Sequence, residues 1–188
     1  MTERAPCHAR RPERPRRGAQ LAWFVAGAVG IAALTGVFTA PAAAATKTEK
    51  TFDSWTVVCI ENDDQVKRCS MIQSRIRAQD KRLVLMWSIS ADDDNRLTQS
   101  LTVPVGISIK EGIRLFIGEG DPETLGYDVC GPRVCIARAD FDARLADATK
   151  AATKASASYV LGNRQLMQVN LDLNGFSAAY DYLVAQLS

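Results

Sequence analysis

The chain has 188 residues, of which 47% are hydrophobic and 23% are charged, and its formal net charge is +2. Residues 1–45 hold six arginines and two acids, so residues 46–188 hold 17 basic and 19 acidic side chains, a net charge of −2. A segment this close to neutral gives no composition-based case for binding nucleic acid or an anionic membrane. The only histidine, His8, precedes residue 46, which excludes histidine triads and histidine-ligated metals from the rest of the chain.

The N-terminal segment has the three parts of a secretory signal. Six arginines up to Arg17 are followed by an uncharged stretch over residues 21–40 and then by small residues at 41–45. This order predicts a signal peptide over residues 1–45 that a signal peptidase removes. A membrane anchor is the alternative, because twenty residues can just span a bilayer. Three glycines dilute the apolar stretch, however, and the alanine run follows it at once.

Removal of this segment leaves about 143 residues, enough for one domain and too few for two. Residues 46–51 are polar, and we expect them to form a flexible leader. Residues 52–188 then form a single domain in which most apolar residues alternate with polar ones, as in strands. The expected strands cover residues 55–60, 68–77, 83–89, 101–110, 113–117 (as the hairpin partner of 101–110), a hairpin over 127–137, and 169–173.

Two segments have a helical period instead. Asp140 is a plausible N-cap for a helix over residues 140–153, and a second apolar stripe predicts an amphipathic helix over residues 175–187 that packs on the sheet. About eight short strands and two short helices predict a mainly β fold. We expect an antiparallel β-sandwich or a partly open barrel with helical covers.

Four cysteines follow the predicted signal peptide, and four cysteines permit three pairings. Cys59 and Cys69 lie five positions on either side of Asp64, so a hairpin folded there places them directly opposite each other. Cys130 and Cys135 flank a Gly-Pro-Arg-Val turn in the same way. Facing positions on antiparallel strands suit disulfides, so we expect the bonds Cys59–Cys69 and Cys130–Cys135. A zinc site is the alternative, but the two spacings are poor for zinc and an oxidising compartment favours disulfides.

One basic cluster stands out after residue 45, formed by Arg75, Arg77, Lys81 and Arg82. Alternation along a strand projects Arg75 and Arg77 from one face, while Lys81 and Arg82 flank the next strand. A solvated edge that blocks aggregation is the simplest interpretation. A surface for an acidic partner is the alternative, so these four residues are our candidate partner-binding residues.

No residue set predicts catalysis. A calcium loop that begins at Asp92 would need glycine and glutamate at two later positions, where the chain has Leu97 and Val103. Asp53 and Asp128 are the carboxylates nearest to aromatic residues and cysteines, yet neither lies in an apolar context that would raise its pKa. We therefore expect a protein that is not an enzyme, with no catalytic residues, no metal and no cofactor.

Several landmarks follow one another in a distinctive order: Phe52–Cys59, Cys69–Gln73, Leu101–Gly106, the Glu111–Ile113 turn, the Cys130/Cys135 pair and Val169–Ala179. This order resembles the invasion-associated locus B family of bacterial exported proteins. One departure is Val134, where the resemblance implies a small residue before the last cysteine.

The resemblance implies an exported periplasmic or envelope protein of a Gram-negative bacterium, and some members of the family are associated with invasion of host cells. The family offers no catalytic residues to transfer to this chain. We expect a non-enzymatic protein that binds an envelope or host protein, or an envelope component, through a β face or edge. The alternatives are an envelope hydrolase that uses a pair of carboxylates and a small-ligand carrier with its cavity in a barrel mouth.

Overall fold

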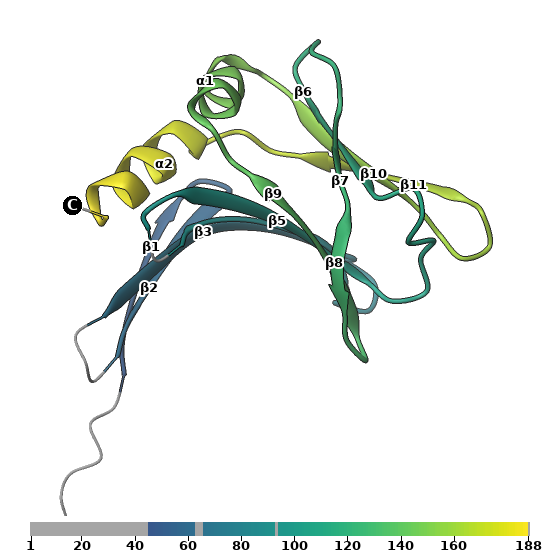
Figure 1. Cartoon of the computed structure of the whole chain (residues 1–188), viewed down its shortest axis with the longest axis horizontal. Coiled ribbons are helices and arrows are strands. Elements are labelled where there is room, and N and C mark those ends of the chain that lie inside the picture. The colour runs from purple at the N-terminus through teal and green to yellow at the C-terminus, as the bar shows by residue number, and fades with distance from the viewer. Residues whose placement is uncertain (1–44, 63–65, 93, 188) are drawn as a thin grey trace, which may run out of the picture. The chain divides into compact units, whose positions relative to one another are not determined.

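The computed structural model describes residues 45–62, 66–92 and 94–187, and the predicted signal peptide lies almost wholly outside them. The described residues form eleven strands and two helices (Figure 1). All strand pairs are antiparallel, and the strands belong to two separate sheets.

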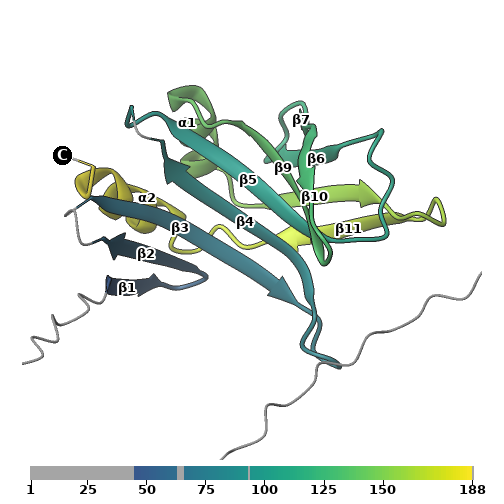
Figure 2. The same ribbon diagram turned by 60° about the horizontal axis from the view of Figure 1, so that its bottom comes forward.

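The larger sheet has seven strands, and its first five follow one another as successive hairpins (Figure 2). Its inner face is apolar because alternate side chains, such as Val57, Met71 and Leu101, point into the core. In spatial order the strands are β1 (Thr46–Phe52), β2 (Trp55–Glu61), β3 (Lys67–Ile76), β4 (Leu83–Ala91), β5 (Leu97–Pro104), β9 (Val134–Asp140) and β8 (Tyr127–Cys130).

The segment 46–51, which we expected to be a flexible leader, is a strand. β1 pairs with β2 from Thr46 opposite Glu61 to Phe52 opposite Trp55. Without β1, the outer edge of β2 would present a row of unpaired N–H and C=O groups, and pairing with β1 satisfies them. Residues 46–51 are all exposed, which explains why their polar composition is compatible with a strand.

The smaller sheet has four strands in the order β11 (Leu166–Leu171), β10 (Ala155–Val160), β6 (Ile113–Ile117) and β7 (Glu123–Leu125). The expected hairpin between 101–110 and 113–117 is therefore wrong. β5 ends at Pro104, and Gly106 has a φ of 90°, so the chain bends away and crosses to the other sheet. β6 then pairs with β10 and β7 instead of with β5.

The smaller sheet and the second helix cover the same face of the larger sheet (Figure 1). α2 (Phe176–Ala185) packs on β1, β2 and β3, and α1 (Ala143–Ala151) contacts α2. The centre of this core is aromatic. Trp55 is edge-on to both Trp87 and Phe176 with ring centroids 5.2 Å apart, and all three side chains are buried. Such pairs contribute beyond the area that they bury.

Both helices are shorter than expected. The side chain of Asp142, and not that of Asp140, caps α1 by accepting a hydrogen bond from the Leu145 N–H at 2.8 Å. α2 begins after Gly175, whose φ is 81°. A Cβ atom at Gly175 would lie 2.1 Å from the Phe52 carbonyl oxygen, so only glycine allows the start of α2 to approach the end of β1 this closely.

The fold prediction is confirmed in its class, which is mostly antiparallel β with two helices. The two sheets face each other without closing into a barrel, so the arrangement is sandwich-like. Besides β1, sequence reasoning missed the short β7 and also β10, whose inward residues include the small Ala155 and Ala157. Alternating alanine and serine give little hydrophobic contrast, which is why the period of two was not recognised there.

Candidate functional site

The two disulfides join Cys59 to Cys69 and Cys130 to Cys135, the pairs suggested by the spacing. In both cases the two cysteines are directly opposed in the strand register, and their Cα atoms are 4.0 Å apart. Three of the four residues are buried, whereas Cys130 is exposed. The disulfides therefore stabilise two hairpins and leave one sulfur near the solvent.

The candidate partner-binding residues gather around the β3–β4 turn, but they differ in their contacts. Arg75 donates its Nε–H to the Asn170 carbonyl at 2.9 Å, so this side chain bridges the two sheets. Arg77 and Arg82 each lie 3.5 Å from the Asp80 carboxylate. Lys81 is exposed and has a φ of 57°.

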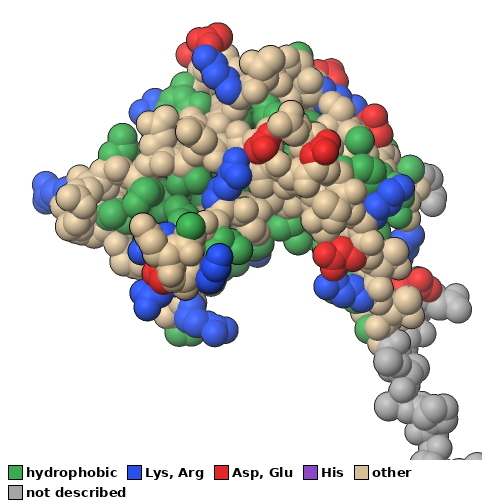
Figure 3. Space-filling view, turned by 180° about the vertical axis from the view of Figure 1, so that it is seen from behind, with side chains coloured by type: hydrophobic (Ala, Val, Ile, Leu, Met, Phe, Trp, Pro, Cys, Tyr) green, Lys and Arg blue, Asp and Glu red, His purple; other side chains and the backbone are tan. Residues whose placement is uncertain are grey.

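Figure 3 shows one face of the molecule. Over most of this face Asp and Glu side chains are interspersed with Lys and Arg, whereas basic side chains predominate at lower left. Because Asp80 already lies within ion-pair distance of two of the four candidate residues, the cluster offers less unpaired positive charge than its sequence indicates.

A hydrogen-bond network fixes the segment after β11 to the larger sheet. Gln73 is 2% exposed; its Nε2 donates to the Asp172 carbonyl, and its Oε1 accepts from the Asp172 N–H at 3.0 Å. Trp55 Nε1 donates to the same carbonyl at 3.0 Å. The Ser54 hydroxyl donates to the Asp172 carboxylate at 2.7 Å, and this bond, with one from the Asn174 N–H, holds the pKa of Asp172 below its ordinary value.

A second polar network lies inside the core. Trp87 Nε1 donates to Gln99 Oε1, and Gln99 Nε2 donates to Glu123 Oε2, both at 3.1 Å. Burial raises the pKa of Glu123 above its ordinary value, although the Gln99 hydrogen bond acts in the opposite direction. Gln99 itself is fully buried, so its amide connects an aromatic core residue with a carboxyl group on β7. Glu123 is the described carboxyl group whose environment most nearly suits acid–base chemistry.

Several other carboxyl groups are engaged by neighbouring residues. The Asp172 carboxylate accepts the Ser54 hydrogen bond, and its lowered pKa makes it a weak base. Asp128 forms an ion pair with Arg138, and Asp92 accepts backbone hydrogen bonds in its own turn, which lower its pKa. The described part of the chain also contains no cluster of three metal-ligating side chains.

A groove of about 580 Å³ lies on the outer face of the smaller sheet, and we call it the β10 groove. Ser156 and Ser158 on β10 form its floor. Phe116 and Arg114 on β6 border one side, and Leu166, Gln168 and Asn170 on β11 border the other. Strand alternation explains the arrangement, because the neighbouring residues of the same three strands point into the core.

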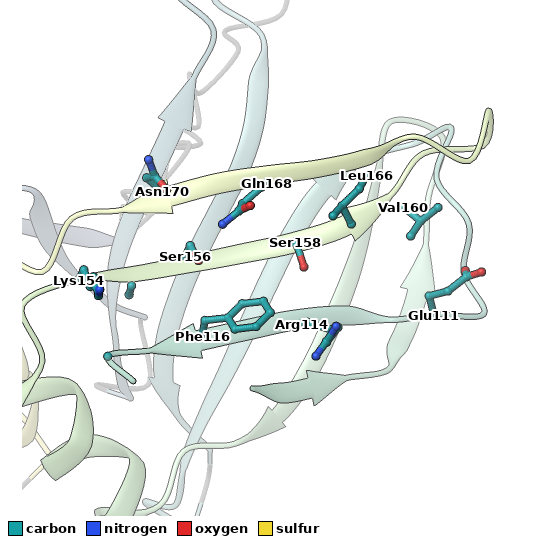
Figure 4. Close-up of a pocket in the computed structure, with 12 residues that line it drawn as sticks. Glu111, Arg114, Phe116, Lys154, Ser156, Ser158, Val160, Leu166, Gln168 and Asn170 are labelled. Atoms are coloured by element: carbon teal, nitrogen blue, oxygen red, sulfur yellow. The ribbon is translucent and has the colours of Figure 1, made fainter. Parts of the chain in front are cut away.

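Figure 4 shows the side chains of the β10 groove, with the Phe116 ring between β6 and β10. The Arg114 guanidinium carbon lies 5.2 Å from the centre of that ring. At one end of the groove Lys154 forms an ion pair with Glu119 at 2.7 Å, and at the other end Glu111 accepts a hydrogen bond from Ser108. These bonds hold the pKa values of Glu119 and Glu111 below the ordinary value.

Sequence reasoning found none of the residues of the β10 groove. Arg114 and Phe116 are the outward members of a strand whose inward members were recognised as apolar. The signal that could have found them is the run of hydroxyl and amide side chains at every second position, Ser156 and Ser158 on one strand and Gln168 and Asn170 on the next. Such a run gives a polar sheet face without the lysines and glutamates typical of a solvated one.

Comparisons with known proteins agree on one family. Residues 55–184 match the family model described as invasion associated locus B (IalB) protein. An invasion protein B homologue of Brucella abortus is 28% identical over 138 residues, which cover 73% of this chain and 79% of the relative. Invasion protein B of Bartonella bacilliformis is 29% identical over 153 residues, which cover 79% of this chain and 81% of the relative.

A solved structure has the same fold. The crystal structure of invasion associated protein B from Bartonella henselae superposes with a TM-score of 0.66 at 26% sequence identity. The match covers 74% of this chain and 97% of that one. The uncovered share of this chain is comparable in length to the N-terminal segment that precedes the matched family region.

Proposed function

Because the chain belongs to the invasion-associated locus B family, we propose that it is an exported, non-enzymatic protein of the bacterial envelope that binds a partner through the outer face of its smaller sheet. The observation that carries this proposal is the β10 groove. An outward sheet face usually carries solvated charges, whereas this one has a floor of two serines between aromatic, guanidinium and amide side chains.

The disulfides further support export. Both disulfides close hairpins of a small domain, as is typical of proteins in an oxidising compartment such as the periplasm. The described helices are too short or too polar to span a membrane. The relatives are named for invasion, so the partner in this proposal is an envelope or host component.

Binding is tested by capture from the envelope of the bacterium that encodes the chain. Ser158→Tyr fills the floor of the groove, and Ser88→Tyr makes the same change on the outer face of the larger sheet, where Ser88 is half-buried. We expect the wild-type chain and Ser88→Tyr to retain the same envelope component, and Ser158→Tyr to lose it. Identical capture by all three proteins, or no capture in any growth condition, contradicts the proposal.

Export is tested separately by mass spectrometry of the chain recovered from periplasmic and membrane fractions. Cleavage of the predicted signal peptide produces a protein that begins at residue 46, which is the first residue of β1. We expect this form in the periplasmic fraction. Recovery of an uncleaved chain from the membrane fraction would show that residues 1–45 act as an anchor.

A further inference from the structure

We propose that the β10 groove binds a short oligosaccharide with carboxylate groups, an inference that rests on the proposed binding function and specifies its ligand. β10 lies between β11 and β6, so its backbone N–H and C=O groups are already engaged in the sheet. A ligand in the groove is therefore recognised by side chains alone. This excludes the strand addition by which many proteins bind extended peptides.

The nearest sheet edge does not offer strand addition either. The outer edge of β11 lies beside β3, where the Arg75 Nε–H donates to the Asn170 carbonyl and Gln73 binds the backbone of Asp172. The opposite edge, β7, has only three residues, Glu123–Leu125. An extended polypeptide would find neither a free edge nor deep apolar pockets for its side chains beside the groove.

The chemistry of the groove suits a sugar. Ser156, Ser158, Gln168 and Asn170 each supply both a donor and an acceptor, which complement hydroxyl groups that are themselves donors and acceptors. The half-buried Phe116 ring offers an apolar face on which the C–H face of a pyranose ring can stack. The volume of about 580 Å³ is typical of ligand sites.

Arg114 indicates that the ligand carries a negative charge. It is exposed in the middle of the groove, and it contributes to none of the ion pairs found between described residues. Lys154 and Glu111, at the two ends, are engaged with Glu119 and Ser108. A guanidinium binds a carboxylate through two parallel hydrogen bonds, so a sugar carboxylate over Arg114 gives this charge a partner.

Three hexamers distinguish the possible ligands in calorimetric titrations of the purified chain. Hexamannuronate has a carboxylate on each ring, cellohexaose has the same number of rings without charge, and hexaglutamate has the charge on a polypeptide. We expect hexamannuronate to bind and the other two to bind at least about tenfold more weakly. Equal binding of hexaglutamate assigns the groove to polypeptides, and equal binding of cellohexaose shows that carboxylates are not recognised; either result overturns the proposal.

Variants connect binding to the groove. We expect Arg114→Gln to weaken hexamannuronate binding by at least about tenfold and Phe116→Ala by about fivefold or more. Arg144→Gln removes an exposed arginine from α1 and should leave the affinity unchanged. Equal losses in Arg114→Gln and Arg144→Gln would show attraction by net charge only. If no oligosaccharide binds while envelope capture still depends on Ser158, the ligand class is wrong and the proposed function stands.

Discussion

Replacing Gln73 with leucine tests how much the amide that joins β3 to the segment after β11 stabilises the fold. The substitution removes the hydrogen bond to the Asp172 carbonyl and the one from the Asp172 N–H. The carbonyl keeps Trp55 Nε1 as a donor, whereas the N–H loses its acceptor. Each lost bond contributes about 1 kcal/mol, and an unsatisfied buried group costs about 1–3 kcal/mol.

Together these terms predict that Gln73→Leu lowers the free energy of unfolding by about 2–4 kcal/mol, because the added apolar burial of leucine offsets part of the loss. The measurement is urea denaturation followed by tryptophan fluorescence. Gln168→Leu is the matched control, since Gln168 is exposed on the outer face of the smaller sheet, and we expect it to change stability by less than about 0.5 kcal/mol. Equal effects of the two substitutions would refute the reasoning.

Three further predictions concern the backbone, a half-buried carboxyl group and the disulfides. Gly175→Ala should cost at least about 2 kcal/mol in urea unfolding, because the residue has a positive φ and no room for a Cβ; Gly126→Ala, which meets no atom within 4 Å, should cost little. Burial raises the pKa of Glu123, so ionisation of this carboxyl group lowers the free energy of unfolding as pH rises through the folded-state pKa. Glu123→Gln does not ionise, and its stability relative to the wild type should therefore increase between about pH 3.5 and pH 7. A difference in stability that does not change with pH contradicts this prediction. Mild reduction should open the bond between the exposed Cys130 and the buried Cys135 before the Cys59–Cys69 bond, in which both cysteines are buried. Alkylation followed by mass spectrometry measures the order, and the reverse order would argue against exposure as the controlling factor.

The elements that could be predicted from the sequence have strong local signals. β2 and β3 alternate clearly, and their cysteines are symmetric about the turn, so the pairing of Cys59 with Cys69 follows from local geometry. The apolar stripe of α2 likewise predicts a helix that covers a sheet. In each case the residues that determine the structure lie within about ten positions of one another, where hydrophobic period and turn chemistry are informative.

The parts that could not be predicted depend on contacts between distant segments. Nothing near β6 indicates that its partner is β10, about forty positions later. The role of Gln73 is equally hidden, because an alternating strand gives no reason to expect an amide inside the core that binds the backbone of residue 172. The β10 groove combines both difficulties, since it consists of the outward residues of three strands that meet only in the folded chain.

The strand order also has a consequence for the time course of folding. The hairpins β1 to β5 use only neighbouring segments, so they can pair while the remainder of the chain is still being synthesised. The smaller sheet, in contrast, combines β6 and β7 with β10 and β11, which are separated by β8, β9 and α1. Pairings with such long loops form late. The β10 groove therefore forms only once β10 and β11 have joined β6, so a probe of this groove would report completely folded molecules.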